Sequence, residues 1–184
     1  MKNLQPTTYH PQTQKSFTLI ELLLYLAIVT VVLTSLVLFA WNIIETGAKS
    51  GNQEMVTSEA KMLSEKIGYQ IRNANDINIA SSNFGVNLAT TPGNKISLAN
   101  NAPNNPTLID ALNGQARITL GASAAVTLNS TNTNLTNLTF INYTSVDGKT
   151  KNLQYTLTLQ SKYPSHGNVY ESVTLENAAE VRSH

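Results

Sequence analysis

The stretch from Lys15 to Trp41, KSFTLIELLLYLAIVTVVLTSLVLFAW, decides the fold of this chain. The residues from Leu22 to Trp41 carry no charge. At roughly 1.5 Å per residue, a helix of this length spans about 30 Å, which matches the hydrocarbon core of a bilayer. The sequence therefore predicts a membrane-spanning helix, with the transmembrane segment at about residues 20–42.

One carboxylate, Glu21, lies at the amino-terminal edge of this apolar stretch, after Phe17, Leu19 and Ile20. A carboxylate does not help membrane insertion, and it costs on the order of a kcal/mol or more, depending on its depth. One interpretation is a tolerated carboxylate that reaches the lipid headgroups. The other is a functional group, because a charge among apolar helices is favourable only beside an opposite charge.

The segment KSFTLIELLLYLAIV resembles the amino-terminal signal of type IV pilins and of the pseudopilins of type II secretion, and the resemblance extends from Lys15 to Phe39. It implies that a prepilin peptidase cuts between Ser16 and Phe17 and that the new amino terminus of Phe17 is methylated. The family normally has glycine before the cut, where this chain has Ser16. The resemblance also places Glu21 at the position whose carboxylate pairs with an amino terminus in the growing filament.

Residues 1–16, MKNLQPTTYHPQTQKS, are polar and contain two lysines but no acidic residue. Pro6 and Pro11 each remove a backbone donor and restrict the residue before them, so no stable helix is expected before Lys15. An ordinary secretory signal peptide does not fit, because the apolar stretch is too long and no small-residue cleavage site follows it. The segment is either a removable leader, which we favour, or a cytoplasmic tail on a signal-anchor helix.

The charges that flank the apolar stretch predict its orientation. Lys2 and Lys15 precede it, and Glu45 is the first charge after it. The positive-inside rule then leaves the amino terminus in the cytoplasm and sends most of the chain outward. We expect a single-pass protein of the cytoplasmic (inner) membrane, which the resemblance would later place in a filament at the cell surface or in the periplasm.

Apolar residues continue beyond the membrane segment with the spacing of a helix. They recur every three or four residues and are Val56, Ala60, Leu63, Ile67, Ile71 and Ala74. Gly47 and Gly51 weaken the helix locally and favour a bend over a break. Because asparagine and aspartate favour turns, the NANDIN sequence of residues 73–78 should end the helix. We predict one helix over residues 17–73, whose second half needs a cover from the rest of the chain.

The remainder of the chain, residues 74–184, contains short patterns typical of strands. The strongest is the strict alternation of apolar and polar residues from Leu153 to Leu159. Weaker patterns lie near residues 96–98, 118–120, 126–128, 138–142 and 172–175. The Asp147-Gly148 pair favours a tight hairpin turn, which Lys149 to Asn152 would lengthen. The sequence NNAPNNP at residues 100–106 is predicted to be a loop.

The predicted fold class is α+β. A long amino-terminal helix, transmembrane in its first half and amphipathic in its second, packs on a carboxyl-terminal antiparallel β-sheet, which is the lollipop plan of pilins. The predicted domains are a prepilin leader at residues 1–16, the long helix at residues 17–73 and a globular β-rich head at residues 74–184.

The composition gives no support for an enzyme. The net charge is +1, charged residues make up 12%, and there is no cysteine, so disulfides and thiolate metal sites are excluded. The sequence contains no nucleophile elbow, no glycine-rich phosphate loop and no histidine–carboxylate cluster with metal spacing, so neither catalytic residues nor a metal or other cofactor is predicted. Lys149 and Lys151 form a small basic tip, which is only weak support for nucleic-acid binding.

The sequence therefore predicts a structural subunit, a minor pilin or pseudopilin, of a type IV pilus-like filament. The resemblance implies a prepilin peptidase, other pilin subunits and an inner-membrane assembly platform as partners, with the lipid bilayer as the environment before assembly. Lys15, Ser16 and Phe17 are assigned to processing, and Glu21 to assembly. The alternative is a single-pass envelope protein that keeps its leader and binds a ligand or DNA through its outward domain.

Overall fold

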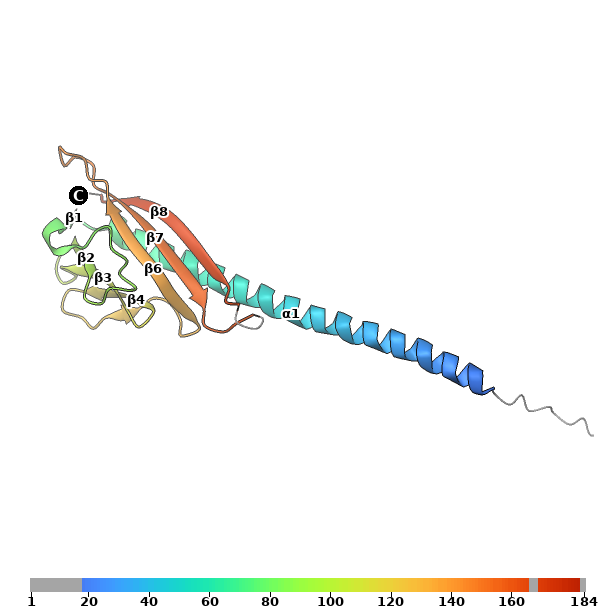
Figure 1. Cartoon of the computed structure of the whole chain (residues 1–184). Coiled ribbons are helices and arrows are strands. Elements are labelled where there is room, and N and C mark those ends of the chain that lie inside the picture. The colour runs from blue at the N-terminus through green and yellow to red at the C-terminus, as the bar shows by residue number, and fades with distance from the viewer. Residues whose placement is uncertain (1–17, 166–168, 183–184) are drawn as a thin grey trace, which may run out of the picture. The chain divides into compact units, whose positions relative to one another are not determined.

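The computed structural model describes residues 18–165 and 169–182. These residues form one long helix, α1 (Leu19–Arg72), and two antiparallel sheets with strand orders β1-β2-β3-β4-β5 and β6-β7-β8 (Figure 1). The strands are β1 (Asp76–Ile77), β2 (Lys95–Ala99), β3 (Thr107–Leu112), β4 (Gln115–Leu120), β5 (Val126–Thr127), β6 (Thr133–Asn142), β7 (Asn152–Ser161) and β8 (Ser172–Glu180), with a short 3-10 helix, η1 (Ile79–Ser81), before β2. The predicted α+β class is confirmed, with two sheets where one was expected.

The chain divides into two compact units at a point inside α1, between Ile44 and Glu45. The first unit contains the amino-terminal half of α1, in which every side chain from Leu22 to Ile44 is exposed. The second unit contains the other half of α1 and both sheets. α1 continues without a break through Gly47 and Gly51.

The apolar stripe in the second half of α1 is the face that the sheets cover. All six residues predicted for it are fully buried, namely Val56, Ala60, Leu63, Ile67, Ile71 and Ala74. They share one hydrophobic core with the inward side chains of β6 and β7, including Phe140 and Leu157. Figure 1 shows this half of α1 lying along the three-stranded sheet. Residues of β7 are buried in strict alternation, as the sequence predicted.

A buried hydroxyl fixes α1 on β7. The hydroxyl of Tyr155 donates to the backbone carbonyl of Ser64 at 2.7 Å and lies 3.1 Å from Ser64 Oγ. Asn177, on β8, donates from Nδ2 to Ser64 Oγ at 3.3 Å. Burial raises the pKa of Tyr155, so the phenol stays in the neutral form that can donate. Gly68, one turn after Ser64, leaves room for this hydroxyl, since a Cβ there would lie 3.0 Å from it.

Asn87 connects the loop before β2 to the free edge of β6. The pairing of β6 with β7 shifts register between Leu135 and Asn137, which is the signature of a bulge. The side chain of Asn87 accepts from the backbone N–H of Leu138 at 3.0 Å and donates to the carbonyl of Thr136 at 3.0 Å. The amide therefore satisfies backbone groups on the side of β6 that faces away from β7.

The sequence patterns predicted β4, the second strand of the β3–β4 hairpin, but not β3. Asp110 weakens the apolar character of β3, but it lies opposite Arg117 on β4, and the two side chains form two hydrogen bonds of 2.8 Å. Asn113 and Gly114 join the strands with φ angles of 52° and 73°. Asn-Gly is the preferred pair for a two-residue turn with positive φ, so this pair is the signal that identifies β3.

We expect Gly68→Ala to destabilise the fold by up to about 1 kcal/mol, because crowding of the Tyr155 hydroxyl and of Arg72 Nη1, each 3.0 Å from the new Cβ, outweighs the better helix propensity of alanine. Tyr155→Phe should itself cost about 1–2 kcal/mol through lost hydrogen bonds. The double variant should then be more stable than the sum of the two losses, since the phenylalanine leaves room for the new methyl group. Urea unfolding of the full chain in detergent measures all three free energies.

Gly51→Ala is the matched control, because nothing lies within 4 Å of a Cβ at that position and alanine favours the helix. It should be neutral or slightly stabilising. Strictly additive losses in the double variant would contradict the contact between Gly68 and the Tyr155 hydroxyl.

Candidate functional site: the first turn and the exposed half of α1

α1 begins with a capped first turn. The backbone N–H of Glu21 lies 3.3 Å from the side-chain oxygen of Thr18 and 3.1 Å from its carbonyl oxygen. Thr18 to Glu21 has the Thr-x-x-Glu pattern of a capping box, and a carboxylate in the first turn also interacts favourably with the helix dipole. Glu21 thus has a local role in starting the helix, which the sequence interpretation missed although the pattern is visible in it.

The carboxylate of Glu21 is available for a further contact. Within residues 18–165 and 169–182 it forms no hydrogen bond or ion pair, and its residue is partly exposed. Lys15, Ser16 and Phe17, which the sequence assigns to processing, lie outside the described residues, as does the whole leader. The processing role of these three residues and the assembly role of Glu21 therefore stay predictions.

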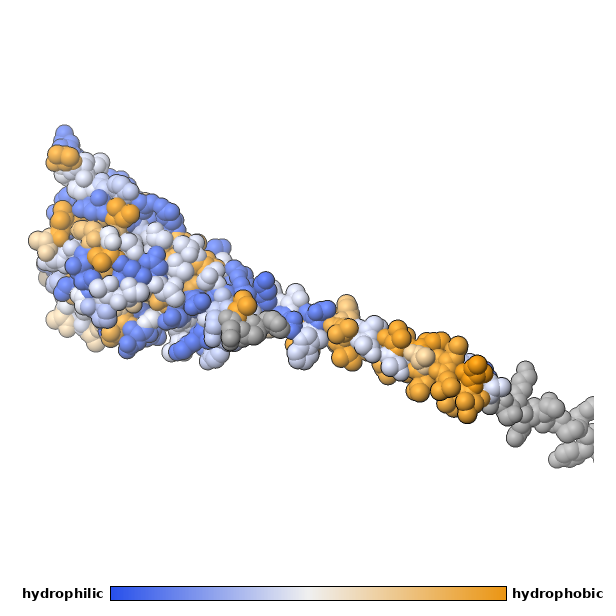
Figure 2. Space-filling view, in the orientation of Figure 1, coloured by the Kyte–Doolittle hydropathy of each residue, from blue (hydrophilic) through white to orange (hydrophobic). Residues whose placement is uncertain are grey.

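The residues after Glu21 present apolar side chains around the whole helix. In Figure 2 these hydrophobic residues cover the amino-terminal part of α1. Among the described residues, α1 is the one helix long and apolar enough to cross a bilayer. Each Å² of apolar surface left in water costs roughly 25 cal/mol, so this half of α1 fits a bilayer or a bundle of other apolar helices.

Three hydroxyl groups within this apolar half are satisfied by the helix itself. Thr30 Oγ1 donates to the carbonyl of Leu26 at 2.7 Å, and Thr34 Oγ1 donates to the carbonyl of Thr30 at 2.8 Å. Ser35 Oγ likewise donates to the carbonyl of Val32 at 2.8 Å. These bonds reduce the cost of placing hydroxyls in an apolar environment. Glu21 is the charged side chain at the start of this half, and within the described residues its carboxylate has no partner.

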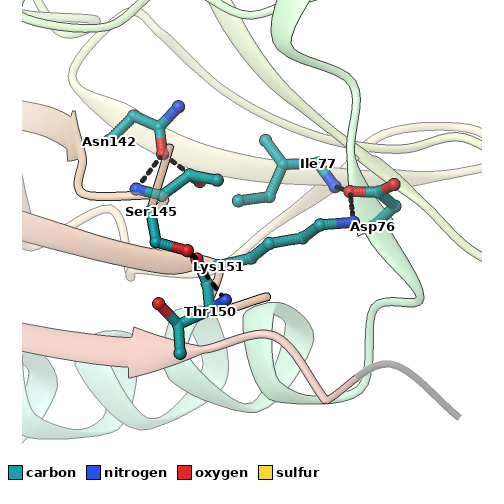
Figure 3. Close-up of polar contacts among 7 residues, drawn as sticks. Asp76, Ile77, Asn142, Ser145, Thr150 and Lys151 are labelled. Atoms are coloured by element: carbon teal, nitrogen blue, oxygen red, sulfur yellow. Dashed lines mark hydrogen bonds and ion pairs between the residues drawn. The ribbon is translucent and has the colours of Figure 1, made fainter. Parts of the chain in front are cut away.

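In the second unit, an ion pair holds the connection between β6 and β7. Figure 3 shows the side chain of Lys151 extending to Asp76, just after α1, where the two charged groups lie 2.7 Å apart. Asp76 also accepts from the backbone N–H of Ile77 at 2.6 Å. The hydrogen bond from Lys151 lowers the pKa of Asp76 below its ordinary value of 3.8. The pair joins the end of this connection to the segment that leaves α1.

Short polar bonds shape the rest of this connection, residues 143–151. Ser145 Oγ donates to Asp147 at 2.6 Å and accepts from the backbone N–H of Thr150 at 3.0 Å (Figure 3 shows the latter). The carbonyl of Ser145 accepts from the N–H of Gly148 at 2.9 Å, and Gly148 has a φ of 67°. Asp147-Gly148 therefore forms a turn as predicted, but within a longer connection.

The basic tip inferred from Lys149 and Lys151 carries little free positive charge. Lys149 lies 3.7 Å from Asp147, and Lys151 forms the close pair with Asp76. A surface that binds nucleic acid needs several cations free to neutralise phosphates. Lys151 is therefore engaged within the fold, Lys149 stays exposed, and nucleic-acid binding remains a prediction with weak support.

Two further acidic side chains of the second unit have a role in the fold. Glu59 on α1 accepts from the hydroxyl of Thr133 at 2.5 Å and from the backbone N–H of Ser130 at 3.2 Å, which ties α1 to the start of β6. Asp110 is paired with Arg117. In the described part of the chain, no group of three or more metal-binding side chains comes together.

We expect the Asp76–Lys151 pair to contribute roughly 0.2–1 kcal/mol to the stability of the fold at neutral pH, because it is partly exposed. Since the pKa of Asp76 is lowered on folding, this contribution is present above pH 3.8 and is lost as the pH falls through the lowered value. Asp76→Asn should therefore reduce the unfolding free energy at pH 7 and differ less from the native chain as the solution is acidified.

At pH 7, Lys151→Gln should lower the unfolding free energy by the same amount as Asp76→Asn. Lys149→Gln changes a more exposed lysine and should lower the unfolding free energy less. Thermal unfolding of the full chain at several pH values measures these differences. A gap between Asp76→Asn and the native chain that widens on acidification would have the wrong sign and would refute this account of the pair.

Comparison with known families gives one match. The family model described as the prokaryotic N-terminal methylation motif matches residues 11–37. The matched segment contains the predicted cleavage point, the capped first turn with Glu21 and most of the exposed apolar half of α1. No curated protein and no solved structure matches the chain.

Proposed function

Because residues 11–37 carry the N-terminal methylation motif of type IV pilins and pseudopilins, we propose that this chain is a structural subunit, a minor pilin or pseudopilin, of a type IV pilus-like filament. The observation that carries the proposal is that this motif leads directly into a helix whose side chains from Leu22 to Ile44 are all exposed and almost all apolar. Such a segment fits a membrane anchor that later packs among other helices.

In this proposal the chain is made as a prepilin with its amino terminus in the cytoplasm and its head outside the membrane. A prepilin peptidase cuts between Ser16 and Phe17, and the new amino terminus of Phe17 is methylated. An inner-membrane platform then transfers the helix from the bilayer into the filament. Lipid and neighbouring helices are similarly apolar, so this transfer depends on close packing and polar contacts between helices.

Glu21 supplies such a polar contact. Cleavage before Phe17 creates a positive amine next to Thr18, at the positive end of the helix dipole, where a cation is unfavourable. The carboxylate of Glu21 lies in that same first turn and has no partner within the described residues. We propose that it pairs with the amine of Phe17, either its own or that of an adjacent subunit. In an apolar bundle this pair neutralises two charges that are each costly alone.

The second half of the chain has the properties of a displayed head. Its core is complete, because the sheets cover the apolar stripe of α1. Several of its acidic groups, among them Asp76 and Glu59, take part in structural bonds, which fits a structural subunit rather than an enzyme. The alternative of an envelope protein with a retained leader predicts the same helix and head, but it leaves Glu21 to the lipid headgroups and assigns it no partner in another protein.

The proposal is tested with Glu21→Val in cells that assemble the filament. We expect a normal amount of the variant in the membrane and a loss of roughly tenfold or more from sheared filaments, because removing one member of a buried ion pair costs roughly 3–5 kcal/mol. Immunoblots of the membrane and filament fractions give both quantities. Glu21→Gln, which keeps the shape of the side chain but not its charge, should show the same kind of defect.

Two controls separate pairing from local effects. Thr18→Ala removes the helix cap, at a cost of about 1 kcal/mol, but leaves the carboxylate of Glu21 in place, so it should be incorporated far better than Glu21→Val. Glu54→Gln removes a carboxylate from an exposed position of the same helix outside the apolar half and should behave as the native chain. Incorporation of Glu21→Val at the native level would refute the proposed pair.

A further inference from the structure

A cavity of about 410 Å³ lies where α1 ends, beside the loop between β2 and β3. None of the residues that line it is charged. Most of its polar groups are side-chain amides, which belong to Gln70, Asn73, Asn75, Asn101 and Asn104. This volume lies within the range of known small-ligand sites, which combine an apolar wall with a few placed polar groups.

Hydrogen bonds fix three of these amides and leave one polar atom of each without a partner. Asn73 donates to the carbonyl of Tyr69 at 2.9 Å, and Asn75 donates to Oδ1 of Asn101 at 2.8 Å. Within the residues that the structure describes, Oδ1 of Asn73, Oδ1 of Asn75 and Nδ2 of Asn101 form no hydrogen bond. The cavity thus offers two acceptors and one donor in held positions, which reduces the entropy lost on binding a ligand.

Asn100 holds the two walls of the cavity together. In the amide orientation that satisfies its neighbours, its nitrogen donates to the carbonyl of Asn73 at 3.1 Å and to that of Ala99 at 3.3 Å. Its oxygen accepts from the hydroxyl of Thr107 at 2.6 Å. These bonds connect the end of α1 to the loop between β2 and β3, so the amides on the two walls keep their spacing.

Tyr69 provides an apolar wall. Its side chain is 60% exposed although it stands beside the buried face of the helix. A second cavity of about 780 Å³ shares Tyr69, Gln70 and Leu120 with the first, and its lining combines apolar groups such as Met62 and Val126 with the charged Glu65, Lys66 and Arg72. The ring of Tyr69 is thus an aromatic surface that a ligand held by the amides can reach.

We propose that this cavity binds a neutral oligosaccharide, with a sugar ring stacked on Tyr69 and its hydroxyls bonded to the amides of Asn73, Asn75 and Asn101. A sugar hydroxyl both donates and accepts, so neighbouring hydroxyls complement fixed acceptors and donors. The absence of charge from the lining favours a neutral ligand over an anionic one. An extended peptide fits less well, because its backbone pairs best with a free strand edge, and this cavity is walled by a helix end and a loop.

The binding site goes beyond the proposed function, because sugar binding is measured on the isolated chain and does not require filament assembly. The experiment uses the full chain in a detergent without a sugar headgroup. Cellotriose, maltotriose and triacetylchitotriose serve as probes, and titration calorimetry together with NMR saturation transfer measures binding. We expect saturable binding of at least one of the three.

Variants of the lining locate the site. Tyr69→Ala and Asn101→Asp should each weaken sugar binding roughly tenfold, which is about 1.4 kcal/mol. Tyr69→Phe keeps an aromatic ring and should retain most of the sugar affinity. Tyr143→Ala and Asn132→Asp remove matched exposed groups outside the cavity and should bind as the native chain does. Saturation transfer from aromatic protons to the sugar should disappear in Tyr69→Ala.

Three results would overturn the proposal. One is that none of the three probes binds saturably, and another is that Tyr69→Ala binds as tightly as the native chain. The third is that the cavity variants lose filament incorporation while their sugar affinity is unchanged, which would identify the cavity as a contact between subunits.

Discussion

The packing of the apolar stripe of α1 on the three-stranded sheet is the constraint on which the rest of the structure depends. The stripe from Val56 to Ala74 is fully buried, and the hydroxyl of Tyr155 fixes its position by bonding to Ser64. A tyrosine at this point needs a small residue opposite its hydroxyl, which Gly68 provides. The buried residues of this core all lie in the unit that begins at Glu45, whereas the side chains from Leu22 to Ile44 are exposed.

One helix therefore serves two environments. Its second half is an ordinary amphipathic helix with a cover of its own, whereas the residues from Leu22 to Ile44 have to find apolar surroundings elsewhere. A bilayer provides these surroundings for a single chain, and a bundle of like helices provides them in a filament. Glu21 distinguishes the two, because a partner for a carboxylate is more readily supplied by another subunit's amino terminus than by lipid tails.

The sequence was sufficient where a single periodic pattern decides the structure. Spacings of three and four residues identified the buried stripe, and strict alternation identified β7, because each pattern reports burial on one face. Pairs distant in sequence could not be inferred. Asp110 is compatible with a strand only because Arg117 lies opposite, and Asn87 reaches β6 across a long separation. For the proposed site, the motif points to Glu21, whose assembly role remains a prediction. The capping of the first turn by Thr18 was visible in the sequence but overlooked. The amide cavity could not be predicted, because it depends on a loop with no periodicity.

The central claim is that the apolar half of α1 becomes the amino terminus of the mature protein. The most direct test is the mass of the amino-terminal peptide of the full chain isolated from cells that make the filament. The account predicts a peptide that begins at Phe17 and carries one added methyl group. A peptide that begins at Met1, with residues 1–16 still attached, would contradict it and would favour a membrane-anchored envelope protein.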